Sequence, residues 1–260
     1  MGRKGAARIM QDRDSYIADL VRREDRDRFL TALFVPADRR ADVQALYAFN
    51  AELARIRNSV SENIIGRMKL QWWRDVIDAI YAGRGGPQGN PVTESLAEVI
   101  IRRNLTRAHF DTIITTRERE MDTDDDGLAF NVTTELETFA EGTASRLIDL
   151  VLEVLEAKAE VAARHVGIGI ALTGILRAVI FQGADEATKK AIAVSAEAHL
   201  AKARDHNVPR AAVPALLGAT IASQYLKTMR RANYQVDHSG MITLRAGVLG
   251  LIWNSWRGVF

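Results

Sequence analysis

HVGIGIALTGILRAVIFQ, from His165 to Gln182, is the stretch that decides the fold of this chain, because its apolar residues surround almost the whole circumference of a helix. A helix that is apolar on nearly every side belongs at the centre of a larger helical bundle. One face has no bulk, since only small residues fall within about 60° of arc: Gly167, Ala171, Gly174 and Ala178. Gln182 lies near the edge of this strip. Such a strip either lets another helix pack closely or forms the wall of a cavity.

A second helix, expected over 37–58, is apolar on two adjoining faces and leaves only a narrow wedge for water. Its last turns belong to the stretch FNAELARIRNSVSEN, Phe49 to Asn63, which runs into a serine-rich turn. Asn50 and Arg57 fall between the two apolar faces. We therefore expect both side chains to point inward, where buried polar groups require partners.

Helical periodicity continues along most of the chain, and alternating strand patterns are nearly absent, so the sequence predicts an all-α fold. No segment rich in Pro, Gly or Ser divides the chain, and we expect residues 1–260 to form one domain with 1–12 as a flexible N-terminus. The helices are expected at 14–34 with a break near Glu24, 37–58, 62–82, 92–104, 107–121, 133–156, 158–181, 185–204, 209–232 and 241–256.

The composition excludes several classes of protein. The 260 residues are 47% hydrophobic and 26% charged, with a net charge of +2, which is no signature of nucleic-acid binding. The absence of cysteine excludes disulfides, thiolate catalysis and Cys-bound zinc. No uninterrupted apolar run approaches the roughly 20 residues of a membrane-spanning helix. Cytoplasm is the expected compartment.

Five segments carry a resemblance to a known family: ALYAF at Ala45–Phe49, MKLQWWRD at Met68–Asp75, FAEGTASRL at Phe139–Leu147, ALTGILR at Ala171–Arg177, and LIWNSWRGVF at Leu251–Phe260. On these residues the chain resembles the squalene/phytoene synthase family over nearly its whole length. The resemblance implies a single-domain isoprenoid-synthase-like helical bundle.

The motifs that give this family its chemistry are altered. In its active members, two facing helices each carry acids four residues apart, which hold Mg²⁺ against the leaving diphosphate. By alignment on ALYAF and LTGILR, these positions fall on Ala54 and Asn58, and on Ala178 and Gln182. None of the four is acidic. We therefore expect no catalytic residue, no metal and no cofactor.

The chain resembles one divergent subgroup more closely, the one that contains the NADH:ubiquinone oxidoreductase (complex I) assembly factor 6 and its bacterial relatives. FN-x-ELA at Phe49–Ala54, the SVSE turn at Ser59–Glu62 and FAEGTAS at Phe139–Ser145 carry this likeness. It implies a non-catalytic protein that binds a complex I subunit or assembly intermediate at the surface of the inner membrane, on the matrix side in mitochondria. An active head-to-head prenyltransferase and an isoprenoid- or lipid-binding module remain as alternatives.

Five residues near the altered motifs are the candidates for ligand binding: Asn50, Arg57, Asn58, Arg177 and Gln182. The two arginines either form structural ion pairs, with Glu137 or Glu141, or bind an anionic headgroup or phosphate, which suits guanidinium geometry. A lipid or prenyl ligand in the remodelled pocket is the expected small-molecule partner.

Four further features have ordinary interpretations. Asp122–Gly127 matches the opening of an EF-hand loop, but position twelve is Thr133 instead of Glu, which favours a solvated acidic loop. The histidines show no ligand spacing, so we expect no zinc site. The four tryptophans are expected in the core and in subunit contacts. Basic residues at 227–231 either solvate a helix end or touch anionic lipid.

Overall fold

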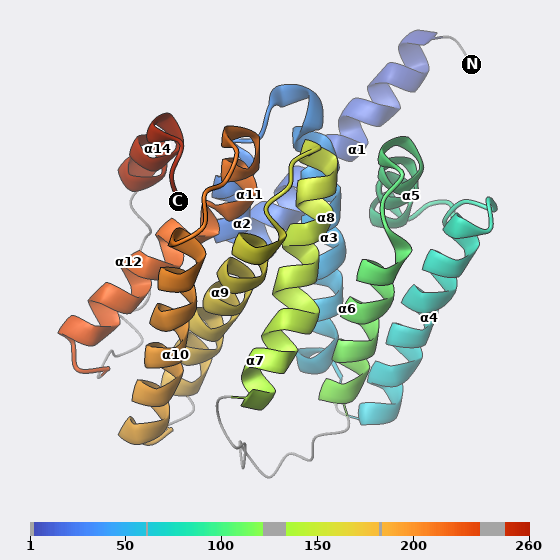
Figure 1. Ribbon diagram of the computed structural model, residues 1–260. Coiled ribbons are helices and arrows are strands. Elements are labelled where there is room, and N and C mark those ends of the chain that lie inside the picture. Colours follow the sequence, from blue (N-terminus) through green and yellow to red (C-terminus); the bar gives the residue numbers. More distant parts are fainter. Residues whose placement is uncertain (1–2, 61, 122–133, 182–183, 235–247) are drawn as a thin grey trace. The chain divides into compact units, whose positions relative to one another are not determined.

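The computed structural model describes residues 3–60, 62–121, 134–181, 184–234 and 248–260, which are helices joined by short connections (Figure 1). These described residues contain no strand. The predicted all-α fold is therefore confirmed. Contacts between Cα atoms divide the chain into two compact units, Met1–Asp124 with Glu153–Leu155, and Asp125–Leu152 with Glu156–Phe260. The organisation as one domain stays a prediction.

Helix α3 is the centre of the first unit. The helices of this unit are α1 (Arg3–Glu24), α2 (Arg26–Ala32), α3 (Ala37–Asn58), α4 (Asn63–Tyr81), α5 (Pro91–Arg103) and α6 (Arg107–Glu120). All five of the others contact α3. Phe49 is fully buried and meets the rings of Trp73 and Phe110 edge-on, at centroid distances of 5.3 and 5.5 Å. The apolar faces predicted for 37–58 therefore do form the core of this unit.

The helix boundaries of the first unit agree with the local sequence signals. The predicted break near Glu24 occurs at Asp25, whose carboxylate accepts a hydrogen bond from the Arg28 amide at 3.0 Å and caps α2. Pro36 directly precedes α3, which begins at Ala37 as predicted. Helix α1 begins at Arg3 and so includes residues that the sequence assigns to a flexible N-terminus. That flexibility stays a prediction.

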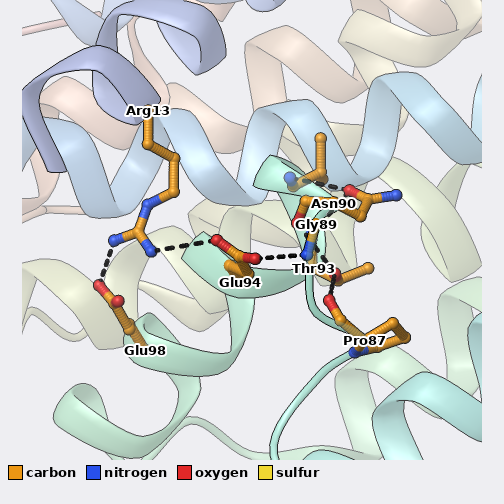
Figure 2. Close-up of polar contacts among 8 residues, drawn as sticks. Arg13, Pro87, Gly89, Asn90, Thr93, Glu94 and Glu98 are labelled. Atoms are coloured by element: carbon orange, nitrogen blue, oxygen red, sulfur yellow. Dashed lines mark hydrogen bonds and ion pairs between the residues drawn. The ribbon is translucent and has the colours of Figure 1, made fainter. Parts of the chain in front are cut away.

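Helix α5 has a complete N-terminal cap, drawn in Figure 2 with the ion pairs of Arg13. The Asn90 side-chain oxygen accepts from the amides of Val92 and Thr93, at 3.0 and 3.2 Å, and Pro91 occupies the first helical position. Arg13 of α1 pairs with Glu98 at 2.5 Å and with Glu94 at 3.8 Å. The cap and these pairs fix the start of α5 against α1.

Replacement of Asn90 by alanine is expected to lower the free energy of unfolding by about 1 kcal/mol. The change removes the acceptor for two amide groups that have no partner within the helix. Urea unfolding of the variant measures the loss. Asn90→Asp keeps an acceptor at the same place and is the matched control, so an equal loss in both variants would contradict the capping role.

The most buried charge of the first unit is the carboxylate of Asp42 on α3. Its side chain is 3% exposed and accepts from Arg103 of α5 at 2.7 Å, and it also pairs with Arg102. The Arg103 side chain is 17% exposed and that of Arg102 is 47% exposed. A buried carboxylate requires such partners, so this cluster joins α3 to α5 through charge as well as apolar contact.

Helix α9 (Glu160–Phe181) is the centre of the second unit, as the sequence predicts. The other helical segments are α7 (Thr134–Ala140), the π-helix η1 (Glu141–Ser145), α8 (Arg146–Leu155, whose last three residues belong to the first unit), α10 (Glu186–Arg204), η2 (Arg210–Ala212), α11 (Val213–Leu216), α12 (Gly218–Arg231) and α14 (Val248–Arg257). Helix α9 contacts α7, η1, α10, α11 and α12. It packs most extensively against α10 (Figure 1).

Helix α9 is also long and apolar enough for a membrane-spanning helix, so its packing must be considered. By length and hydropathy alone, Glu160–Ala178 could cross a membrane, and it is the one such helix among the described residues. Half of this window, 50%, is buried inside the structure, and charged groups at Arg164 and Arg177 interrupt it. Contacts with neighbouring helices account for the buried half of this window.

The segment predicted as one helix over 133–156 is divided in the structure. α7 passes into the π-helical turn η1 and then into α8. Within η1, the Ser145 hydroxyl is buried and donates to the Arg164 carbonyl of α9 at 2.8 Å. A π-turn adds one residue to a helical turn and does not disturb apolar periodicity enough to be seen in sequence. The helix predicted over 133–156 is therefore confirmed from Thr134 to Leu155, and the π-helical turn inside it was not predicted.

Candidate functional site

The first altered motif lies near the C-terminal end of α3. Asn50 is buried, with 5% of its surface exposed, which confirms its predicted inward direction. Ala54 is half-buried and Asn58 is exposed. A methyl group and one exposed amide at the two motif positions supply no carboxylate oxygen, the ligand type that Mg²⁺ prefers.

Arg57 joins the ends of three helices. Its guanidinium donates to the backbone carbonyl of Glu120 in α6 at 3.1 Å and to the Asn63 side chain at the start of α4 at 3.4 Å. A cation near the last carbonyls of a helix interacts favourably with the helix dipole. These contacts support a positioning role for Arg57 in the first unit.

The second altered motif lies on α9, in the second unit. Ala178 is exposed, whereas Gln182 lies outside the described residues. Arg177, beside them, places its guanidinium carbon 4.3 Å from the centroid of the Tyr225 ring, and Tyr225 itself is buried in α12. Stacking of this kind holds an arginine by its planar face.

The two acids proposed as arginine partners have other described contacts. Glu137 accepts from the Ser195 hydroxyl at 2.5 Å, and Glu141 pairs with Arg164 at 2.9 Å and with Arg146 at 3.7 Å. Both acids thus serve packing between α7, η1, α8, α9 and α10. The residues that contact these acids include Ser195 and Arg164, which are distant in the sequence, so the spacing of residues could not predict these contacts.

The strip of small residues on α9 has two different halves. A Cβ atom on Gly167 would lie 2.5 Å from the Ser145 backbone nitrogen, so this half exists for close packing against η1. At Gly174 a Cβ atom would meet no atom of the described residues within 4 Å, and this residue and Ala178 are exposed. The sequence left close packing and a cavity wall as alternatives. Close packing is confirmed at Gly167, and a cavity wall at the Gly174 end stays a prediction.

The structure tests the predictions about the acidic loop and about metal binding only in part. Asp122–Gly127 and Thr133 lie outside the described residues, so the EF-hand interpretation stays a prediction. Across the described ranges, His, Asp and Glu side chains do not form a group of three or more suited to a metal ion. The expected lack of a metal and of a cofactor likewise stays a prediction.

A histidine pair that was not predicted from sequence lies between α9 and α10. The Nδ1 atoms of His165 and His199 are 2.9 Å apart, and the His206 ring stacks on His165 at 6.5 Å. The other ring nitrogen of His199 faces the Glu137 carboxylate at 3.6 Å. One arrangement satisfies all these contacts: His165 donates from Nδ1 to His199, and His199 donates from Nε2 toward Glu137. The two histidines are 34 positions apart, so no helical spacing links them.

This pair resists protonation. Burial lowers the pKa of His165, and the neighbouring His199, Arg164 and Lys202 lower it further. Burial also lowers the pKa of His199, although the Glu137 carboxylate opposes that effect. Two protonated rings would place N–H groups face to face, so the folded protein binds protons here less readily than the unfolded chain.

Acidification is expected to destabilise the protein through this pair. Because the folded pKa values lie below those of unfolded histidine, the stability contribution is complete above about pH 6.5 and is lost as the pH falls below it. His165→Gln removes one titrating ring and is expected to reduce the loss of unfolding free energy between about pH 7.5 and pH 5.5. Urea unfolding at both pH values measures this difference. An unchanged pH dependence in the variant would contradict the account.

The fold defines the class of protein. A dehydrosqualene synthase structure superposes with a TM-score of 0.71 at 17% identity, covering 94% of this chain and 96% of that one. A squalene synthase from Alicyclobacillus acidocaldarius gives a TM-score of 0.68 at 16% identity, covering 86% of this chain and 95% of that one. The chain therefore has the all-α isoprenoid-synthase fold.

The family follows from the sequence itself. The squalene/phytoene synthase family model matches residues 21–188, more than half of the chain, and the chain belongs to this family. It is similar to NADH dehydrogenase (ubiquinone) complex I, assembly factor 6 from Bos taurus, at 32% identity over 94% of this chain and 82% of that protein. The Homo sapiens protein of the same name is 31% identical, over 95% of this chain and 83% of that protein.

Proposed function

We propose that this protein assists the assembly of respiratory complex I without catalysing prenyl transfer. The observation that carries the proposal is its similarity to complex I assembly factor 6, at 31–32% identity over 94–95% of the chain. The similarity includes most of those proteins' own length, 82–83%, and is not restricted to a shared core. It favours assembly over both alternatives.

The chemistry of the altered motifs supports a non-catalytic role. Prenyl transfer in this fold requires carboxylates that hold Mg²⁺ at the diphosphate, because the metal neutralises the charge of the leaving group. Ala54, Asn58, Ala178 and Gln182 provide none of these carboxylates. Loss of all four acids removes the oxygen ligands of a hard cation, whereas loss of a single acid could be compensated.

The partner we propose is a complex I subunit or an assembly intermediate. A lipid-like ligand is the second candidate partner, with the open end of the small-residue strip at Gly174 and Ala178 as its contact surface. We further propose that the protein acts at the surface of the membrane that contains complex I. No nucleic acid is among the proposed partners.

Deletion of the gene tests the assembly role. We expect the deletion strain to lose NADH:ubiquinone activity and to accumulate partly assembled complex I on a native gel, with the other respiratory complexes unchanged. Expression of the wild-type chain from a plasmid should restore both readouts. Fully assembled, active complex I in the deletion strain would refute the proposal.

The lipid-binding alternative has its own test. A delipidated sample is heated with prenyl alcohols or quinones, and a ligand that binds the folded chain raises its melting temperature by mass action. Gly174→Leu fills the open end of the small-residue strip and should abolish such a shift. A shift that survives this change would exclude the Gly174 surface as the binding site, and the absence of any shift would argue against the lipid module.

A further inference from the structure

Helix α14 has an apolar face that the described chain leaves uncovered. On this ten-residue helix, Leu249, Trp253 and Trp256 are 81%, 56% and 69% exposed, and Ile252 is 51% exposed. These four side chains fall within about 100° of arc on one side of the helix. Single exposed apolar residues are common, but a contiguous face of large ones marks an interaction surface.

The tryptophans were expected in the core and in subunit contacts, and the core position is confirmed for Trp73. Trp73 is buried, whereas Trp72, Trp253 and Trp256 are 40%, 56% and 69% exposed. Subunit contacts stay a prediction.

The opposite face of α14 is fixed to α12, so the exposed residues are held on an ordered helix. Leu251 is fully buried, and the Asn254 amide donates to the Thr220 hydroxyl at 2.9 Å. A Cβ atom on Gly250 would lie 2.5 Å from the Gln224 amide nitrogen, which shows how closely the two helices approach. Because Leu251 is buried against the rest of the unit, the helix cannot rotate to bury Trp253, and the Trp253 side stays exposed.

Two arginines lie beside this face of α14. The sequence of α14, VLGLIWNSWR, contains no acid. Arg257 lies over the Trp253 ring, with its guanidinium carbon 5.9 Å from the centroid, and the exposed Arg210 donates to the Trp256 carbonyl at 3.3 Å. The arginines stand at the C-terminal end of the helix, next to the tryptophan pair, whose centroids are 5.6 Å apart.

We propose that α14 is an interfacial helix that lies in the surface of an anionic phospholipid bilayer. Leu249 and Ile252 would enter the acyl region, the tryptophan rings would lie at headgroup level, and Arg257 and Arg210 would contact lipid phosphates. A protruding helix face suits a planar, deformable lipid surface better than a protein groove. Lipid binding by α14 is argued from the helix itself, and only the identity of the membrane rests on the proposed function.

Vesicle sedimentation tests the proposal on the purified full-length chain. We expect it to bind phosphatidylcholine vesicles that contain phosphatidylglycerol, and to bind pure phosphatidylcholine more weakly, by about fivefold for each arginine engaged. Leu249→Ser/Trp253→Ser/Trp256→Ser should weaken binding by about a hundredfold, because three large apolar side chains no longer enter the bilayer.

The matched control is a triple change on the exposed face of α4, Ile64→Ser/Met68→Ser/Trp72→Ser. These residues are 59%, 66% and 40% exposed, and the control variant should bind vesicles like the wild type. Circular dichroism verifies that both variants are folded. In addition, brominated lipid should quench tryptophan fluorescence in the control variant and not in the α14 variant.

Three results would overturn the proposal. They are wild-type protein that does not bind anionic vesicles, equal loss of binding in both triple variants, and a wild-type dimer that the α14 variant converts to a monomer. The last result would assign the face to a second copy of the chain. The two proposals can fail separately. A failed vesicle experiment does not contradict the assembly role, because gene deletion tests that role. Intact complex I in a deletion strain likewise does not contradict vesicle binding.

Discussion

Gly167→Ala is expected to destabilise the protein by about 3 kcal/mol, which lowers the melting temperature by roughly 6–10 °C. The added methyl group would lie 2.5 Å from the Ser145 backbone nitrogen in the π-helical turn η1. Backbone cannot move aside as the end of a flexible side chain can, so α9 and η1 must separate. Separation also breaks the hydrogen bond from the Ser145 hydroxyl to the Arg164 carbonyl. Thermal unfolding followed by circular dichroism measures the effect.

Gly174→Ala is the matched control on the same helix. Among the described residues, nothing lies within 4 Å of a Cβ atom at Gly174, so we expect the same methyl group to cost no packing there. Alanine in a helix interior is more stable than glycine by about 0.5–1 kcal/mol, and this variant should be unchanged or slightly stabilised. Equal destabilisation of the two variants would show that the small residues of α9 do not have separate roles.

Arg102→Met/Arg103→Met is expected to cost about 3–5 kcal/mol of unfolding free energy. Both arginines pair with the Asp42 carboxylate, which is 3% exposed and cannot reach water when they are removed. The penalty is mostly the desolvation of a charge left without its cations. Asp42→Asn should cost less, because it removes the buried charge, and Arg102, which is 47% exposed, can turn to solvent.

The control for this cluster is a surface arginine. Arg107 pairs with Asp111 at 3.2 Å and also with Asp78, but the Arg107 and Asp78 side chains are 47% and 44% exposed. Pairs that are this exposed contribute little to stability, so Arg107→Met should leave unfolding unchanged within error. Urea unfolding of all three variants at one pH makes the comparison. A larger loss for Arg107→Met than for the double variant would contradict this assignment of the buried charge.

Much of the fold could be predicted, because the strongest signals in the sequence are local. The predicted helix over 37–58 coincides with α3, and the segment at 158–181 contains α9, each of which contacts most of its unit. Amphipathic periodicity and the prolines and caps at helix ends depend only on nearby residues. The π-helical turn at Glu141–Ser145 was not predicted, since its reason lies in the contact of Ser145 with α9.

The candidate site could be predicted only in part. The loss of acids at Ala54 and Asn58 is visible in the sequence, and Asn50 is buried as expected. The contact of Arg57 with the Glu120 carbonyl and the stacking of Arg177 on Tyr225 join distant segments, so spacing could not predict them. The pair formed by His165 and His199 was missed for the same physical reason, because adjacent helices bring together residues with no common period.

The most direct test of the central claim, that this chain retains the fold and has lost the metal–diphosphate site, is calorimetric titration with farnesyl diphosphate in the presence and absence of Mg²⁺. The same samples are analysed for condensation products. We expect no product and no Mg²⁺-dependent binding, because Ala54 and Asn58 on α3 and Ala178 on α9 carry no carboxylate. Turnover, or binding of the diphosphate that requires Mg²⁺, would contradict it.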